Sequence, residues 1–220
     1  MCFSPEADLT TGIVVGVIGI DALRHASRPQ QMVIASLPVL LAAHQVDEAL
    51  VWWGLRGQLS PAVTHAAVYI FLTVAFALPF LVPAATLGIE PVLRRRVIMT
   101  GLLVMGAATT VALLAAIVGA PVGATIVGHH IAYTAQVSYG NLLVVLYVLA
   151  TCGSMLVASS RPLMVLGLCN LGAVIALAWI TFTGFTSLWC AWAAVTSVAI
   201  AVYLRRSGHD NAPIPVRAMP

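Results

Sequence analysis

Long apolar runs alternate with short polar breaks along the whole chain. Seven of these runs approach the roughly 20 residues that a helix needs to cross the hydrocarbon core of a bilayer. The breaks predict helices at about residues 5–24, 30–55, 62–87, 97–118, 139–158, 162–182 and 187–204. We therefore predict an all-α integral membrane protein, in which residues 1–204 form a single seven-transmembrane-helix bundle and residues 205–220 form a polar, disordered tail.

One segment, between the fourth and fifth predicted helices, departs from this pattern. Residues 119–138 are less hydrophobic than their neighbours and include the sequence Gly128-His129-His130. We interpret this segment as a connection that lies on the membrane surface and could form a lid over the bundle.

The composition agrees with a membrane protein and excludes two classes of function. Hydrophobic residues make up 61% of the chain and charged residues only 8%, whereas a soluble domain carries about 25% charged residues. All ten basic residues are arginine, so a retinal pigment is excluded, because its Schiff base needs a lysine. The net charge of +3 arises from arginines placed where membrane topology favours them, and it requires no nucleic-acid partner.

The placement of the arginines also orients the bundle, because cytoplasmic loops of membrane proteins carry an excess of basic residues. One side of the predicted bundle holds only Arg56. The other side holds nine arginines: Arg24, Arg28, Arg94, Arg95, Arg96, Arg161, Arg205, Arg206 and Arg217. This distribution predicts a multi-pass protein of the cell membrane with its N-terminus outside and its C-terminus in the cytoplasm.

The four cysteines, at positions 2, 152, 169 and 190, form no Cys-x-x-Cys motif. Cys152 and Cys169 lie in apolar helices, where a thiol usually serves as a small hydrophobic side chain. Cys2 and Cys190 are both expected near the outer face of the membrane, so a disulfide between them is geometrically possible.

Three ionisable side chains, those of His44, Asp47 and Glu48, lie in the outer half of the second predicted helix. At 3.6 residues per turn they share one face, and either Val51 or Trp52 follows on that face one turn later. Acids inside a bilayer are costly to bury and usually face the interior of a bundle, where they mark functional sites. Two interpretations remain open: the cluster holds helices together, or it acts as a general acid or base.

The other polar and aromatic residues of the predicted helices and loops gather at the same outer end. We assign a substrate pocket there to Trp52, His65, Tyr133 and Trp189. The remaining outer residues are Cys2, Ser4, Glu6, Asp8, His129, His130, Gln136, Cys190 and Trp192. An aromatic belt at the membrane interface explains some of the tryptophans without any ligand. Trp52 differs from them, because it lies on the acidic face, where its ring could stabilise a cationic centre.

Two other classes of function would use the same outer residues. A metal or a haem could be bound there, although no spacing in the sequence is diagnostic of either. The candidate ligands are His44, Glu48, His65, His129, His130 and Cys2. The acidic cluster could instead relay protons in a transporter or sensor, although the chain has no convincing internal repeat of the kind common in transporters.

The opening Met1-Cys2-Phe3-Ser4, together with the pattern His44-Gln45-x-x-Glu48-x-x-x-Trp52, resembles a family of small bacterial seven-helix membrane proteins. Some members look like the membrane-bound terpene cyclases of indole-sesquiterpenoid pathways, which are similar in architecture to the fungal meroterpenoid cyclases. The resemblance covers all seven predicted helices, and its motifs are short. It implies cyclisation of a polyprenyl chain, started by protonation of an alkene or epoxide, without a metal or loss of diphosphate.

Carried over by position, the resemblance implies a proton donor, two residues that adjust it and one that shields cationic intermediates. These are Glu48, Asp47 with His44, and Trp52, respectively. The fungal pattern also has an acid in its last helix, where this chain has none, so Asp47, Glu6 or Asp8 would have to replace it. We therefore expect a membrane-bound terpene cyclase, of isomerase or lyase type, that acts on a lipophilic prenylated substrate such as a farnesylated indole, without any cofactor.

Overall fold

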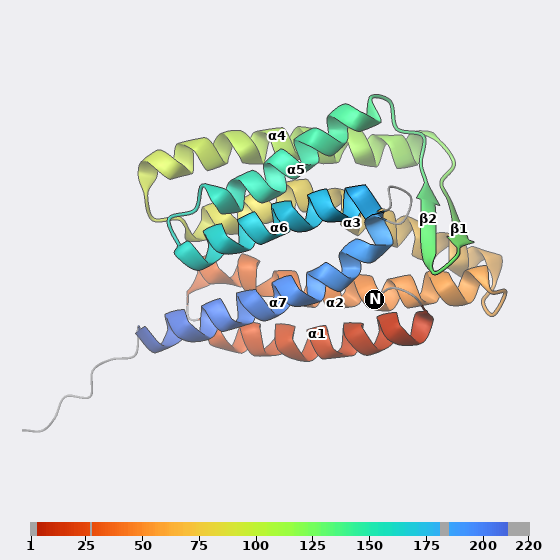
Figure 1. Cartoon of the computed structure of the whole chain (residues 1–220), viewed down its shortest axis with the longest axis horizontal. Coiled ribbons are helices and arrows are strands. Elements are labelled where there is room, and N and C mark those ends of the chain that lie inside the picture. The colour runs from red at the N-terminus through yellow and green to blue at the C-terminus, as the bar shows by residue number, and fades with distance from the viewer. Residues whose placement is uncertain (1–3, 27, 181–184, 211–220) are drawn as a thin grey trace, which may run out of the picture.

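A computed structural model describes residues 4–26, 28–180 and 185–210, except for the side chains of residues 177–180, 185–191, 193 and 206–210. Within these residues the chain forms seven helices and a two-stranded hairpin (Figure 1). The helices are α1 (Pro5–His25), α2 (Pro29–Leu55), α3 (Pro61–Ile89), α4 (Leu93–Gly119), α5 (Gly140–Leu156), α6 (Arg161–Ile180) and α7 (Phe185–Asp210). The strands are β1 (Gly123–Val127) and β2 (His130–Thr134). The predicted helical bundle is thereby confirmed.

Short polar breaks with proline or serine explain where several helices begin. The Ser4 hydroxyl accepts a hydrogen bond from the Ala7 amide, and the Ser60 hydroxyl accepts one from the Val63 amide. Each serine precedes a proline in the first turn, where the missing amide hydrogen of proline has no cost to the helix. By length and composition, α2, α3 and α4 could each span a membrane.

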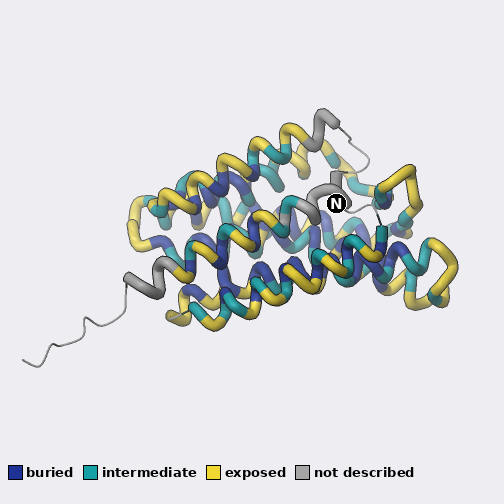
Figure 2. Tube along the Cα trace, turned by 60° about the horizontal axis from the view of Figure 1, so that its bottom comes forward, coloured by how far each residue is buried: buried dark blue, intermediate teal, exposed yellow. Residues whose placement is uncertain are grey.

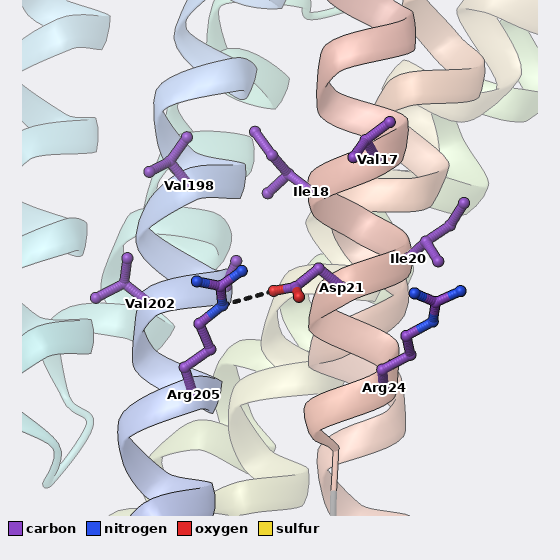
Figure 3. Close-up of a pocket in the computed structure, with 9 residues that line it drawn as sticks. Val17, Ile18, Ile20, Asp21, Arg24, Val198, Val202 and Arg205 are labelled. Carbon is purple, nitrogen blue, oxygen red and sulfur yellow. Dashed lines mark hydrogen bonds and ion pairs between the residues drawn. The ribbon is translucent and has the colours of Figure 1, made fainter.

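The helices form a bundle in which α2 is central and the first and last helices, α1 and α7, pack side by side and run in the same direction (Figure 1). α2 packs against α1, α3 and α7, and α7 also packs against α1 (Figure 1). We call the end of the bundle that carries the hairpin its outer end and the opposite end its inner end (Figure 1). Near the inner end, Arg205 Nε of α7 donates a hydrogen bond of 2.7 Å to Asp21 Oδ2 of α1 (Figure 3). Buried residues line the inside of the bundle, and exposed residues cover its outer surface (Figure 2). The placement of the catalytic candidates therefore depends on α2.

Two helix boundaries differ by more than two residues from those predicted. α4 begins at Leu93, so the arginines at positions 94–96 lie in its first turns and not in a loop. α7 continues to Asp210, so residues 205–210 of the predicted disordered tail are helical. The tail prediction for residues 211–220 concerns positions outside the described residues.

The connection at residues 119–138 forms an antiparallel hairpin, which the purely helical prediction did not include. Val127 pairs with His130 and Gly123 pairs with Thr134. Gly128, in the two-residue turn, has a φ of 58°, a left-handed conformation that glycine adopts without strain. The hairpin lies at the end of the bundle where α2 ends and α3 begins (Figure 1).

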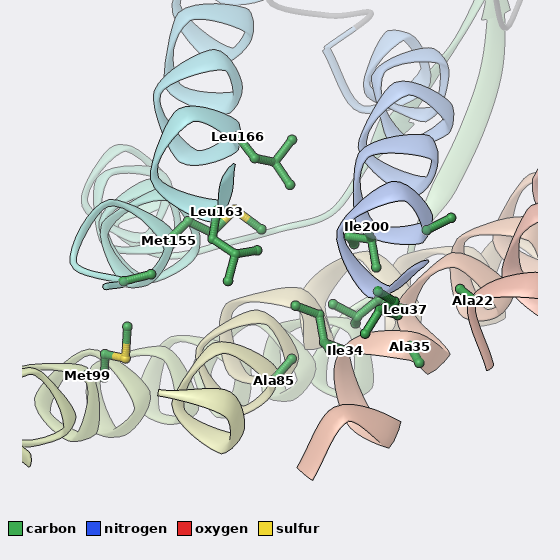
Figure 4. Packing of buried hydrophobic residues seen from close by; sticks show 13 residues of the cluster. Ala22, Ile34, Ala35, Leu37, Ala85, Met99, Met155, Leu163, Leu166 and Ile200 are labelled. Carbon is green, nitrogen blue, oxygen red and sulfur yellow. The ribbon is translucent and has the colours of Figure 1, made fainter. Parts of the chain in front are cut away.

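Two large apolar clusters divide most of the described core along the bundle axis, and a small third one contains Leu41 and Leu78. The inner cluster joins all seven helices, with Ile34, Met99 and Ile200 among its members (Figure 4). The outer cluster joins α2 and α3 to the end of α4 and to the hairpin, and includes Trp52 and Phe71. The hairpin therefore belongs to the hydrophobic core and is more than a surface connection.

Where α3 and α4 cross, position 106 has no room for any side chain. A Cβ atom added to Gly106 of α4 would collide with the carbonyl oxygen of Pro79 in α3. Gly101, one and a half turns earlier in the same helix, has nothing within 4 Å of its added Cβ position. Gly106 therefore fixes the closest approach of α3 and α4.

The inner ends of the helices are joined by a polar network around Glu90. The Glu90 carboxylate accepts hydrogen bonds from the Ser159 amide at 2.8 Å, the Ser159 hydroxyl at 2.7 Å and the Val92 amide at 3.0 Å. Arg95 donates to the carbonyl oxygens of Val157 and Ala158 at the end of α5. Two of the loops are thereby fixed to each other.

This network gives the stability of the protein a specific pH dependence. Burial alone would raise the pKa of Glu90, but the hydrogen bonds from Ser159 and Val92 and the charge of Arg95 outweigh burial and lower it. The stability that the carboxylate contributes is therefore complete above its unfolded-state pKa of about 4.3. It is lost as the pH falls through the lower pKa of the folded state.

We expect Glu90→Gln to lower the stability at neutral pH by about 1–3 kcal/mol, because the amide replaces a charged acceptor of three hydrogen bonds. The difference in Tm between wild type and variant should shrink on acidification below about pH 4, where the wild-type carboxylate also becomes neutral. Thermal unfolding in detergent at a series of pH values measures both. A difference that stays constant down to about pH 2 would contradict the role assigned to the carboxylate.

Candidate functional site

The acidic cluster of α2 is buried inside the bundle. Glu48 is 0% exposed, His44 6% and Asp47 8%. Gln45, between them in sequence, is 2% exposed. Such a concentration of buried polar side chains on one helix is costly and marks a functional site when it lies within a membrane.

Helical geometry shows how these side chains are distributed around α2. At about 100° per residue, Glu48 lies about 40° from His44 on one side, and Asp47 lies about 60° from it on the other. Glu48 shares its direction with Trp52, one turn later. Asp47 lies close in direction to Gly54, whose added Cβ would meet the Thr64 side chain of α3. His44 therefore lies between the two acids on one face of α2, and Asp47 lies on the side of α2 that meets α3.

A stack of three rings connects His44 to the hairpin. The His44 ring lies parallel to Phe71 of α3, with 4.1 Å between ring centroids. Phe71 in turn stacks on Tyr133 of β2, with centroids 4.3 Å apart and planes 7° apart. The hairpin thus reaches the acidic cluster through two aromatic contacts, each worth about 0.5–1.5 kcal/mol beyond burial.

Trp52 closes the outer side of the cluster. Its side chain is 2% exposed, and the guanidinium carbon of Arg56 lies 5.3 Å from its ring centroid. This contact is a cation–π interaction at the outer end of α2. The positive charge of Arg56 therefore lies near one part of the Trp52 ring, and the rest of the ring surface faces the buried core.

Three buried polar atoms on α2 have no hydrogen-bond partner among the described residues. They are Nδ1 of His44, Oδ2 of Asp47 and Nε1 of Trp52. Leaving a buried polar group without a partner costs about 1–3 kcal/mol. A polar ligand or water molecules would remove that cost, which is the behaviour expected of a binding site.

A further buried acid lies beside the cluster on α1. Added Cβ positions at Gly12 and Gly16 would approach Val46 and Ala42, so α1 and α2 run antiparallel in a defined register. Asp8, one turn before Gly12 on the same face and 1% exposed, is therefore level with the Glu48–Leu50 turn of α2. Of the two acids on α1 that could replace the missing acid of the last helix, Asp8 is buried, whereas Glu6 is exposed.

The structure brings some of the predicted pocket residues to the cluster and separates others from it. Trp52 and Tyr133 lie there, as predicted. His65 is exposed and packs its ring against Tyr69, away from His44. The prediction that His65 lines the same pocket is therefore not supported. The Trp189 side chain lies outside the described residues, as do the Cys2 and Cys190 side chains of the proposed disulfide.

The alternative metal site also depends on residues that lie apart. His129 is exposed in the hairpin turn, and His65 is exposed on α3. In the part of the chain that the structure describes, no three His, Cys, Asp or Glu side chains are grouped so that they could hold a metal ion.

Sequence reasoning did not identify Phe71 as part of the site. Phe71 is one of many apolar residues in α3, and nothing in its neighbourhood marks it. Its role depends on a stack between two segments that are far from it in sequence, so only the tertiary structure reveals it. The sequence could have predicted Gln45 as a buried residue of the site, because an amide in an apolar helix, close to two acids, is unusual and marks a functional position.

This arrangement can supply and hold a proton in a water-poor site. Carboxylic acids buried among apolar groups are favoured in their neutral form, in which they can donate a proton. The aromatic faces of Tyr133 and Trp52 could stabilise positive charge, whereas both faces of Phe71 are covered by His44 and Tyr133. The chemistry most compatible with the site is therefore proton transfer to or from an apolar substrate.

Comparison with known proteins places the chain in a family. Residues 1–215 match the model of one family, described as a family of unknown function (DUF6629). No curated protein and no solved structure matches the chain. Because the match extends over nearly all of the 220 residues, the chain belongs to the DUF6629 family.

Proposed function

We propose that this protein is a membrane-bound terpene cyclase that starts ring closure by protonating an alkene or epoxide of a prenylated substrate. The observation that carries the proposal is Glu48, a carboxylic acid with 0% exposure, one turn from His44 on one side and from Trp52 on the other. The resemblance of the His44-Gln45-x-x-Glu48-x-x-x-Trp52 pattern to such cyclases supports the same assignment.

In this proposal Glu48 gives its proton to the CH carbon of the last double bond of the isoprenoid chain, which leaves a tertiary cation on the neighbouring carbon, or to the oxygen of an epoxide, whose C–O bond then breaks to leave the same type of cation. The resulting cation is attacked by internal double bonds, so carbon–carbon bonds form while π bonds are consumed. Trp52 and Tyr133, whose ring is held in place by the stack on Phe71, stabilise the positive charge during these steps. Loss of a proton to a base, for which Asp8 is the best-placed second carboxylate, ends the reaction. The net change is an isomerisation, because one proton is added and another is lost.

The surface of the bundle supports the proposed location in the cell membrane. Val97, Val104, Val111 and Val118 recur every seventh residue along α4 and are 64–85% exposed. Exposed apolar rows of this length are unfavourable in water and natural in a bilayer. Together with the arginines at one end, they favour seven spans with the N-terminus outside and the C-terminus in the cytoplasm.

The decisive experiment offers a farnesylated indole to detergent-purified protein in H₂O and in D₂O, each with and without a chelator. We expect an isomeric cyclic product under all four conditions, with one deuterium incorporated in D₂O, because the proton of Glu48 exchanges with solvent. Mass spectrometry reads both outcomes. A cyclic product without deuterium would contradict initiation by protonation. Product that vanishes on chelation would move the assignment to a metal-dependent enzyme.

A further inference from the structure

A groove separates α1 from α7 at the inner end of the bundle, opposite the acidic cluster (Figure 3). Its volume is about 530 Å³. Its walls are apolar and include Val17 and Ile20 of α1 and Val198 and Val202 of α7. Two arginines, one from each helix, lie at the inner end of these walls: Arg205 faces Asp21, and the side chain of Arg24 points away from both (Figure 3).

The charges of the groove leave capacity for an anion. Arg24 and Arg205 carry two positive charges and Asp21 one negative charge, so the net charge is positive. Arg205 binds Asp21 through Nε, and its two terminal nitrogens make no hydrogen bond to any described residue. Arg24 forms no hydrogen bond or ion pair within the described part of the chain. A phosphate group could therefore accept hydrogen bonds from the terminal nitrogens of Arg205, while Arg24 adds a second positive charge at the same end of the groove.

The apolar walls extend from these arginines towards the middle of the bundle. Val17 and Val198 each precede the arginine of their helix by seven residues, which is about 10 Å of helix. Val17 is 64% exposed, Val198 46% and Val202 42%, so all three side chains are accessible to a partner. An elongated apolar partner would cover them on the membrane side.

We propose that this groove binds one anionic phospholipid of the cytoplasmic leaflet. Arg205 binds its phosphate, Arg24 attracts the charge of the headgroup, and an acyl chain lies along the valine walls. A phospholipid matches both the arginines and the valine walls. Its charged headgroup would lie at the inner end, beside the arginines, and its acyl chain would extend along the valines. The proposal rests on the location of the protein in the membrane, and it is independent of the reaction proposed at Glu48.

The test measures lipid binding by native mass spectrometry of detergent-purified protein titrated with dioleoyl phosphatidylglycerol or dioleoyl phosphatidylcholine. We expect wild type to bind the anionic lipid at least about fivefold more tightly, because each arginine near a phosphate favours an anionic lipid by about that factor. Arg24→Gln should reduce this preference about fivefold. Because Arg24 is exposed and has no described partner, the variant should fold as wild type does. Circular dichroism and Tm check this.

Two further variants separate the groove from the general charge of the inner surface. Arg94→Gln removes an exposed arginine at the same end of the bundle, outside the groove, and should leave the preference unchanged. Val202→Trp fills the groove from a partly exposed position and should weaken binding of both lipids.

Four outcomes would overturn the proposal. These are equal affinity of wild type for the two lipids, equal losses in Arg94→Gln and Arg24→Gln, undiminished binding by folded Val202→Trp, and a dimer that forms through this face in place of lipid binding. Inorganic phosphate serves as the probe of the headgroup alone. Binding of inorganic phosphate as tight as that of phosphatidylglycerol would also overturn the proposal that an acyl chain occupies the groove. Because none of these measurements needs turnover, the result stands whether or not the protein is a cyclase.

Discussion

Glu48→Gln should abolish cyclisation while leaving the protein folded. The amide has nearly the same shape as the carboxylic acid but cannot donate a proton to an alkene, and loss of a general acid typically reduces the rate by about 10²–10⁴-fold. Because Glu48 is fully buried, a substitution of equal volume should preserve packing around it. The initial rate of product formation and the Tm of the detergent-purified variant measure the two expectations separately.

A matched control is available in Glu6→Gln, which removes an exposed carboxyl at the start of α1. This variant should retain wild-type turnover, because the Glu6 side chain is directed to solvent. Turnover of the wild-type kind by folded Glu48→Gln would refute Glu48 as the proton donor. In that case Asp47→Asn and Asp8→Asn would be the next variants, since both acids are buried near the same level of the bundle.

Gly106→Ala should destabilise the fold strongly, although it adds only one methyl group. The new Cβ would collide with the backbone carbonyl of Pro79, and a backbone atom cannot move aside by changing a rotamer. Overpacking typically costs about 1–3 kcal/mol and sometimes more, and we expect at least about 3 kcal/mol at this crossing. For a protein of this size, that loss lowers the Tm by roughly 6–12 °C.

Gly101→Ala is the control for this substitution. It makes the same chemical change in the same helix, at a position with open space around the added methyl. Alanine is intrinsically favoured over glycine in a helix by about 1 kcal/mol, so the control should be neutral or slightly stabilised. Equal Tm values for the two variants would show that α3 and α4 do not cross as closely at Gly106 as the structure has them.

The helices were predictable because each one is a long apolar segment with a recognisable start. The prolines at positions 5, 29 and 61 follow polar residues and begin three of the helices where the sequence indicates. The burial of His44, Asp47 and Glu48 was predictable for a related reason, since acids in an apolar helix must face the interior. Periodicity and hydropathy are local properties, and these features depend on little else.

The hairpin has a sequence signal that hydropathy obscures. The β-branched residues of Ala124-Thr125-Ile126-Val127 precede the two-residue turn Gly128-His129, and a second run with Ile131 and Tyr133 follows. Two such runs around a short glycine turn are typical of a β-hairpin. In a chain dominated by membrane-length helices, the same residues resemble no more than a less hydrophobic connection.

Contacts between distant segments could not be predicted. The arginines at positions 94–96 fit the positive-inside rule, yet Arg95 also binds the last carbonyl groups of α5. Asp21 and Arg205 are 184 residues apart in sequence, and nothing local pairs them. Phe71 enters the site only because α2 and the hairpin meet on either side of it.

The position of α7 against α1 and α2 has a consequence for biogenesis. Because α7 follows the other six helices along the chain, the bundle cannot close until α7 has been synthesised. Until then, the face of α2 that α7 will cover has no helix to pack against. During membrane insertion the nascent chain must keep α2 and its buried acids away from lipid without its final partner. Packing of α7 against α1 and α2 therefore completes the bundle, and the Asp21–Arg205 contact can form only at that stage.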